Sequence, residues 1–170
     1  KKIIPTYKFM KKDIYNNNNS NIINKITPFS ERILSPADFG LHNTLSLKGK
    51  INTFIDFEYF GWDDPVKLVS DFYWHPAMNL SINLKNQWLD ELKLIFKSSL
   101  FNKKLSICLN LYGIRWSLII LNIFTEEGLS KFKQKYGSKT NPRYKKEQFK
   151  KSNEIFLQIN DNLNSRFINV

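Results

Sequence analysis

Three oxygen-bearing side chains, Asp38, Asn43 and Asp56, have types and spacing that suit metal-assisted chemistry. Asp38 and Asn43 lie five residues apart, and Asp56 follows eighteen residues after Asp38. A carboxylate can accept or orient a proton, and an Asn–Asp pair offers the hard oxygen ligands that Mg²⁺ prefers. The three residues therefore predict a carboxylate for proton handling beside a pair of magnesium ligands, provided that the fold brings them together.

The elements that must position these residues are a strand, a loop and a hairpin. Residues 32–35 form a short apolar strand, and residues 44–48 alternate apolar and polar side chains before a glycine turn. The second strand of the hairpin is expected over residues 51–57. Because a hairpin returns the chain to the end where it began, we expect Asn43 and Asp56 to be neighbours.

Helical patterns occupy the rest of the chain. Asp64 followed by Pro65 is a typical helix start, because the carboxylate caps free backbone N–H groups and proline fits the first turn. This helix is expected to end near His75. Apolar spacing predicts further helices over 84–100, over 103–124 with a buried central part from Trp116, and from 142 onward, with a basic connector over 131–139.

At these residues the chain resembles the aminoglycoside phosphotransferase and choline kinase-like families, which are small-molecule kinases with a protein-kinase-like fold. The resemblance rests on D-F-G-L-H-N at Asp38–Asn43, on I-D-F-E-Y at Ile55–Tyr59 and on G-W-D-D-P at Gly61–Pro65, and it extends to Asp71. It implies a mostly helical α+β fold equivalent to the C-terminal lobe of such a kinase, with a small β-hairpin carrying the catalytic and metal loops.

The same resemblance divides the chain. Residues 31–170 would form the kinase-like lobe, and residues 1–30 a polar, asparagine-rich segment of uncertain structure. The six glycines form no phosphate-covering loop, and no V-A-I-K-like strand lysine is found. The N-terminal lobe that covers the nucleotide is therefore expected to be missing. A second departure is Pro36, which stands where the family usually has a histidine two residues before the catalytic aspartate.

The resemblance also implies roles for single residues. Asp38 would be the catalytic base or orienting carboxylate, and Asn43 and Asp56 would hold Mg²⁺ beside ATP. Asp71 would support the catalytic loop by accepting hydrogen bonds from its backbone. Glu58 is a candidate metal or substrate contact, with a solvated loop glutamate as the alternative. The implied reaction is transfer of the γ-phosphoryl group of ATP to a hydroxyl or amine of a small polar molecule, weak or absent in this chain alone.

Other readings of the polar residues remain open. Taken singly, Asp38 is a turn-forming aspartate and Asn43 a capping asparagine. With one cysteine, Cys108, and two histidines, no zinc-ligand spacing exists. We therefore expect a packing or polar role for His42, and for His75 a place at a helix end, where the helix dipole favours an imidazole.

The net charge of +11 raises the alternative of a basic nucleic-acid-binding domain. Only four of the 26 basic residues are arginine, the residue that base readout favours, so a solvated lysine-rich surface is the preferred interpretation. A further alternative is a non-catalytic kinase-like remnant or regulatory module. The single cysteine is compatible with the cytoplasm, and the apolar window 116–124 is too short to span a membrane.

Overall fold

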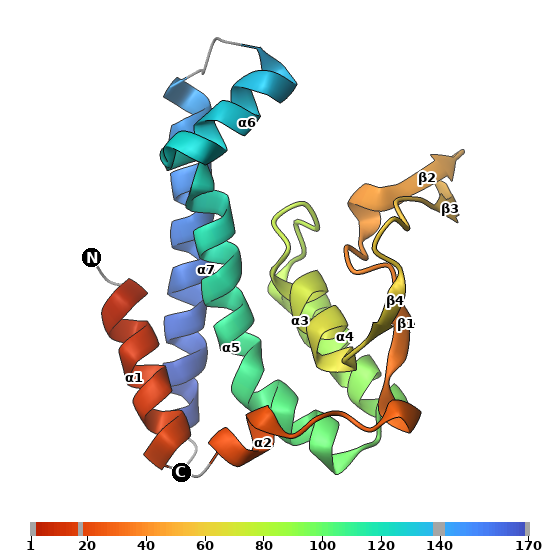
Figure 1. The fold of residues 1–170 in the computed structure, drawn as a ribbon, viewed down its shortest axis with the longest axis vertical. Coiled ribbons are helices and arrows are strands. Elements are labelled where there is room, and N and C mark those ends of the chain that lie inside the picture. The colour runs from red at the N-terminus through yellow and green to blue at the C-terminus, as the bar shows by residue number, and fades with distance from the viewer. Residues whose placement is uncertain (1–2, 17–18, 138–141, 169–170) are drawn as a thin grey trace. The chain divides into compact units, whose positions relative to one another are not determined.

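The computed structural model describes residues 3–16, 19–137 and 142–168, which are mostly helical with two small antiparallel sheets (Figure 1). The expected α+β, mostly helical class is therefore confirmed. By their internal contacts the residues form two compact units, Met10–Tyr112 and a second unit made of Lys1–Phe9 with Gly113–Val170. The helices are α1 (Ile3–Asn16), α2 (Ser20–Asn24), α3 (Pro65–Trp74), α4 (Ile82–Ile95), α5 (Ser99–Leu121), α6 (Glu126–Tyr136) and α7 (Pro142–Ile168).

The strands lie between α2 and α3 and form two separate ladders. They are β1 (Ile33–Ser35), β2 (Thr44–Leu47), β3 (Lys50–Phe54) and β4 (Gly61–Asp63), with a 3₁₀ turn, η2 (Leu41–Asn43), before β2. β2 and β3 form the expected hairpin. Lys48 and Gly49 both have positive φ, 51° and 76°, as a tight hairpin turn requires.

Two features of the strands differ from the sequence prediction. β3 ends at Phe54 rather than at residue 57, and Asp56 has a left-handed φ of 68° that no strand residue can have. β1 pairs with β4 in a ladder that joins Ile33 to Asp63 and Ser35 to Gly61. Asp63 is the last residue of β4. The pairing of β1 with β4 thus joins the segment before the β2–β3 hairpin to the segment after it.

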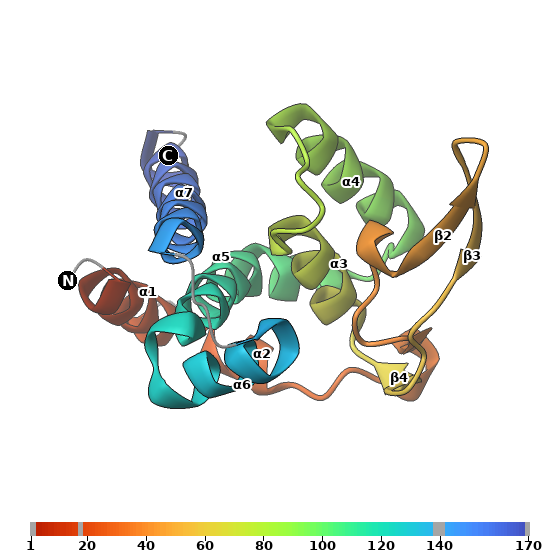
Figure 2. The same cartoon turned by 90° about the horizontal axis from the view of Figure 1, so that it is seen from above.

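The core of the Met10–Tyr112 unit is built by α3, α4 and the first half of α5. Figures 1 and 2 show α3 and α4 side by side. As expected, Asp64 caps α3 by accepting a hydrogen bond from the Val66 N–H at 2.9 Å. The buried side chains of this core are Val66, Val69, Leu92, Phe101 and Leu105.

Several helix boundaries differ from the prediction. The expected helices over 84–100 and 103–124 are α4 and α5, which are separated at residues 96–98, where Ser98 accepts hydrogen bonds from the N–H groups of Leu100 and Phe101. The expected connector 131–139 is largely helix, because α6 starts at a Thr125 cap and carries acidic residues in its first turn and basic residues in its last.

The N-terminal segment is also more ordered than its composition indicated. The described parts of residues 1–30 contain α1 and α2, while Asn17 and Asn18 of the asparagine run lie outside the described residues. Ile3 and Met10 lie two turns apart on one face of α1, and Met10 is buried, whereas Ile4 is 64% exposed. The segment whose structure the sequence left uncertain therefore contains two helices in its described parts.

The helix α5 with its following turn extends over 26 residues, Ser99–Phe124, and within the described chain it is the one helix long and apolar enough to cross a membrane. The apolar window 116–124 is the C-terminal part of this longer segment, and core helices of soluble proteins meet the same criterion. The prediction of a buried central helix is wrong in part, because Leu118 is 50% exposed and Ile119 38%.

Candidate functional site

The sequence-predicted site lies on two loops of the Met10–Tyr112 unit. The Asp38 loop, residues 36–43, joins β1 to the hairpin, and the Asp56 loop, residues 55–60, leaves it. Within the first loop the Asn43 side-chain amide donates to the Asp38 backbone carbonyl at 2.9 Å and lies 3.5 Å from the Asp38 carboxylate. The structure therefore brings Asp38 and Asn43 together, with the Asp38 side chain 52% exposed.

The hairpin brings the second loop to the same end. The Ile55 N–H donates to the Asn43 backbone carbonyl at 2.9 Å, so Asp56 directly follows a residue bonded to Asn43. This confirms the expectation that the chain returns Asp56 to the neighbourhood of Asn43. The Asn43 side chain uses its amide nitrogen, and not its amide oxygen, in these hydrogen bonds within the loop.

Backbone strain is concentrated at this site. Among the described residues, four that are not glycine have positive φ: Ala37, Lys48, Asp56 and Asn79. Ala37 (φ 63°) precedes Asp38, and Asp56 (φ 68°) is itself a predicted metal ligand. Left-handed backbone costs a non-glycine residue energy and is maintained only where the surrounding contacts fix it. Such strain at both predicted loops is typical of functional sites.

Phe39 fixes the Asp38 loop to its surroundings. Its ring stacks on Phe54 of β3 at 5.2 Å between centroids and packs against Phe72 of α3 at 5.8 Å. Phe72 in turn contacts Trp88 of α4 at 4.1 Å. The residue directly after Asp38 thus joins the loop, the hairpin and the helical core through one series of rings.

Lys67 provides a polar attachment for the same loop. Its ammonium donates to the Ala37 carbonyl at 3.3 Å and lies 3.0 Å from Asp63 and 3.6 Å from Asp71. Asp71 is only 9% exposed, and Lys67 connects it to the loop backbone. The structure thus places Lys67, which sequence reasoning missed, between Asp71 and the loop backbone, while the hydrogen bonds from the loop backbone to Asp71 that the resemblance implies stay a prediction. The i,i+4 spacing of Lys67 from both aspartates was the available signal.

Two histidines, His42 and His75, flank the Asp38 carboxylate, and we refer to them as the imidazole pair. The His42 Nε2 lies 3.2 Å from one carboxylate oxygen, and the His75 Nε2 lies 3.8 Å from the other. The two rings are stacked, with centroids 4.2 Å apart and planes inclined by 7°. Sequence reasoning missed this cluster, because His75 comes from the far end of α3.

The ligand atoms of Asp38, His42 and His75 lie within 4.8 Å of one another, a spacing that a metal ion could bridge. Two features count against a metal there. A metal lies in the plane of each imidazole that binds it, and nearly parallel stacked rings have no common in-plane position. In addition, the His75 Nδ1 accepts a hydrogen bond from the Ala77 N–H at 3.1 Å, so its proton belongs on Nε2. The geometry of the cluster therefore argues against a metal centre.

Burial changes the pKa of two side chains in this unit. It lowers the pKa of His75 to about 4, and His42 lowers it further, while the Asp38 carboxylate opposes the change. His75 is consequently neutral at neutral pH and carries one ring proton. Burial also raises the pKa of the Cys108 thiol to about 11, so Cys108 is no thiolate nucleophile near neutral pH.

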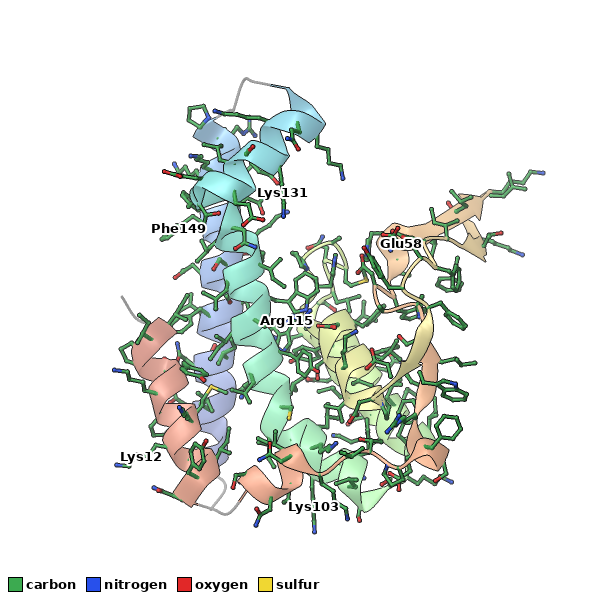
Figure 3. All side chains as sticks on the ribbon, in the orientation of Figure 1. Lys12, Glu58, Lys103, Arg115, Lys131 and Phe149 are labelled. Atoms are coloured by element: carbon green, nitrogen blue, oxygen red, sulfur yellow. The ribbon has the colours of Figure 1, made fainter. Side chains whose placement is uncertain are left out.

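The Asp56 loop is more open than the Asp38 loop. Glu58 lies in an exposed turn, closed by a hydrogen bond from the Phe60 N–H to the Phe57 carbonyl at 3.0 Å (Figure 3). Tyr59 is 73% exposed. No ion pair or side-chain hydrogen bond of Glu58 is found with the described residues, so nothing there distinguishes a metal contact from a solvated glutamate.

A cavity of about 240 Å³ forms a second feature of this unit, between residues 27–33, the start of α3 and the α4–α5 junction. Its wall includes a buried ion pair in which the Lys104 ammonium lies 3.0 Å from Asp64 and 2.8 Å from the Thr27 hydroxyl. Burial alone would raise the pKa of Asp64, but hydrogen bonds from Thr27, the Val66 N–H and Lys104 hold it below its ordinary value. This network attaches the chain before β1 to α3 and α5.

Comparison with known proteins adds no identification. No family model matches the chain, and neither a curated protein nor a solved structure matches it. The function must therefore be inferred from the geometry of the two loops.

Proposed function

We propose that this chain is a kinase-like phosphotransfer lobe that acts on a small polar molecule. The observation that carries the proposal is the arrangement of Asp38 and Asn43 in one tightly bonded loop, with Asp56 returned beside Asn43 by the hairpin. The left-handed backbone at Ala37 and Asp56 supports it, because such strain is maintained where the position of a side chain matters. The motif resemblance supplies the reaction class.

Each residue has a defined part in this proposal. Asp38, which is half exposed, orients the acceptor hydroxyl or amine and accepts its proton. The Asn43 amide oxygen and the Asp56 carboxylate are the groups that would hold Mg²⁺. When bound, the cation neutralises charge on the β- and γ-phosphates of ATP. The positive net charge of the chain favours the approach of an anionic nucleotide.

We expect the rate of phosphoryl transfer by this chain alone to be low. Without a phosphate-covering loop in the sequence, ATP would contact these residues from one side only, so transfer by this chain alone would be slow. A second lobe would raise the rate by excluding water from the phosphates. Asp71 belongs to the support of the Asp38 loop, and Glu58 is a further metal or substrate contact on the Asp56 loop.

The test separates metal binding from transfer. Mn²⁺, in place of Mg²⁺, is titrated into the chain with ATP and followed by electron paramagnetic resonance, and ATP turnover is measured with water or a panel of small alcohols and amines as acceptor. We expect Asp56→Asn to weaken Mn²⁺–ATP binding by about tenfold or more, the effect of removing one charged ligand. Asp38→Asn should retain binding and lose turnover.

Asp90→Asn is the matched control, because Asp90 lies on α4 and its ion pair with Lys93 is exposed. It should behave like the unchanged chain. Equal binding and turnover in all four proteins would overturn the proposal and favour a non-catalytic remnant. Binding to DNA or RNA that falls steeply with salt and ignores Asp38 and Asp56 would instead favour the nucleic-acid alternative.

A further inference from the structure

The most detailed side-chain arrangement outside the predicted triad is the imidazole pair with the turn that follows α3. His75 ends α3, where its N–H donates to the Asp71 carbonyl at 2.8 Å. The turn after it then folds back, since the Met78 N–H donates to the His75 carbonyl at 3.1 Å. The turn meets the Asp38 loop directly, because the Leu41 N–H donates to the Met78 sulfur at 3.3 Å.

The close approach of loop and turn depends on Gly40. A Cβ added at Gly40 would lie 2.3 Å from the Met78 methyl carbon and 2.7 Å from the His42 Nδ1. Both distances are far below contact distance, so a larger residue would push the His42 ring or Met78 away. The glycine therefore allows His42, Met78 and the loop backbone to pack in one place, which in turn puts His42 over His75.

The orientation of the His75 ring is set by one hydrogen bond and by the His42 ring stacked on its face. The Ala77 N–H donates to Nδ1 at 3.1 Å, which leaves the single proton of the neutral ring on Nε2. That nitrogen lies 3.8 Å from an Asp38 carboxylate oxygen, which is close but longer than a hydrogen bond. The stacked His42 ring restricts rotation of His75, and its own Nε2 lies 3.2 Å from the other carboxylate oxygen.

We propose that His75 is a positioning residue that, with His42 stacked on it, directs an N–H toward Asp38 and holds the carboxylate in its working orientation. The expected effect on turnover rests on the proposed function. The arrangement of the three side chains is independent of that function. His75 would supply from the end of α3 the imidazole support that Pro36, two residues before Asp38, lacks. A fixed carboxylate spends less time in unproductive rotamers.

Two variants of His75 separate positioning from general stability. His75→Gln keeps an amide N–H at about the reach of Nε2, whereas His75→Asn keeps an acceptor near the Ala77 N–H but is too short to reach Asp38. If Asp38-dependent ATP turnover is present, we expect His75→Asn to lower kcat about tenfold with KM for Mg²⁺–ATP unchanged, and His75→Gln to recover to within about threefold. Equally low kcat in both folded variants would overturn the proposal.

Nitrogen NMR of the full chain at pH 7 tests the same contacts without any activity. We expect His75 to carry its proton on Nε2, with Nδ1 as acceptor, and its Nε2 signal to move in Asp38→Asn but not in Asp90→Asn. A proton on Nδ1, or no response to Asp38→Asn, would overturn the proposal. So would equimolar Zn²⁺ shifting both imidazoles, since the cluster would then be a metal site.

The turnover assay and the NMR experiment distinguish failure of the phosphotransfer function from failure of the positioning role of His75. If the chain and all variants lack turnover while His75 gives the expected NMR signals, the phosphotransfer function fails and the His75–Asp38 contact stands. If turnover depends on Asp38 but the NMR signals contradict the expected tautomer, the phosphotransfer function stands and the positioning proposal fails.

Discussion

The two loops of the candidate site are held in very different ways. The Asp38 loop is attached through a ring stack at Phe39, an ammonium at Lys67 and the turn containing Met78. The Asp56 loop is attached by the hydrogen bond from Ile55 to Asn43, while most of its side chains are exposed: Ile55 40%, Phe57 47%, Tyr59 73% and Phe60 50%.

This difference indicates which half of the site is preorganised. A group that must meet a reacting atom with correct geometry benefits from a rigid position. A metal ligand on a more open loop can adjust when a flexible hard cation binds. The structure thus attaches the loop of the proposed proton-handling carboxylate through several elements, and the loop of the proposed metal-binding carboxylate through the hydrogen bond of Ile55 to Asn43.

The largest expected effect comes from removing the ring that anchors the first loop. Phe39→Ala should lower the free energy of unfolding by about 2–3 kcal/mol, because the partly buried ring contacts both Phe54 and Phe72. Phe57→Ala, in the Asp56 loop, should cost less than about 1 kcal/mol. Urea unfolding followed by tryptophan fluorescence measures both, and similar losses would remove the contrast between the loops.

A smaller effect is expected from the polar attachment. Lys67→Met removes the donor to the Ala37 carbonyl and leaves the buried Asp71 with one cation fewer, so we expect a loss of about 1–2 kcal/mol. The substitution should accelerate amide hydrogen exchange more in residues 36–43 than in residues 55–60. The exposed pair of Lys93 with Asp90 provides the control, because Lys93→Met should change stability by less than about 0.5 kcal/mol. Uniform exchange changes in both loops would contradict this prediction.

At neutral pH the smallest effect is that of His75 protonation, which appears only as the pH falls below about 6.5. The pKa of His75 is lowered to about 4 in the folded chain from its ordinary 6.5, so between these values the unfolded chain binds a proton that the folded chain excludes. Stability from this residue is therefore complete above about pH 6.5 and is lost as the pH falls toward 4. His75→Gln should show a shallower decline of melting temperature between pH 6.5 and 4 than the unchanged chain. An identical decline would show that His75 is protonated as readily in the folded state as in the unfolded state.

Local features of the fold were predictable because their causes are local. The Asp64 cap with Pro65 gave the start of α3, and the Gly49 turn gave the hairpin. The return of Asp56 to Asn43 followed from the hairpin alone. The connector expected over 131–139 failed for a local reason too, since the Thr125 cap and the charge distribution of α6 were overlooked in favour of its high lysine content.

Features that depend on distant segments could not be predicted in this way. Leu118 and Ile119 belong to an apolar pattern that indicated burial, yet burial requires a partner surface that the pattern does not specify. The β1–β4 ladder and the ion pair of Lys104 with Asp64 likewise join residues far apart in sequence.

By itself, the sequence of this protein determined where its helices cap, where its chain turns and which oxygen-bearing residues gather at one end of a hairpin, because capping and turn formation act between near neighbours. Only the tertiary structure decided that Phe39 and Lys67 would attach the Asp38 loop and that His42 and His75 would flank its carboxylate. Those contacts exist because α3 packs against the loop, and the position of a packed helix depends on the whole core.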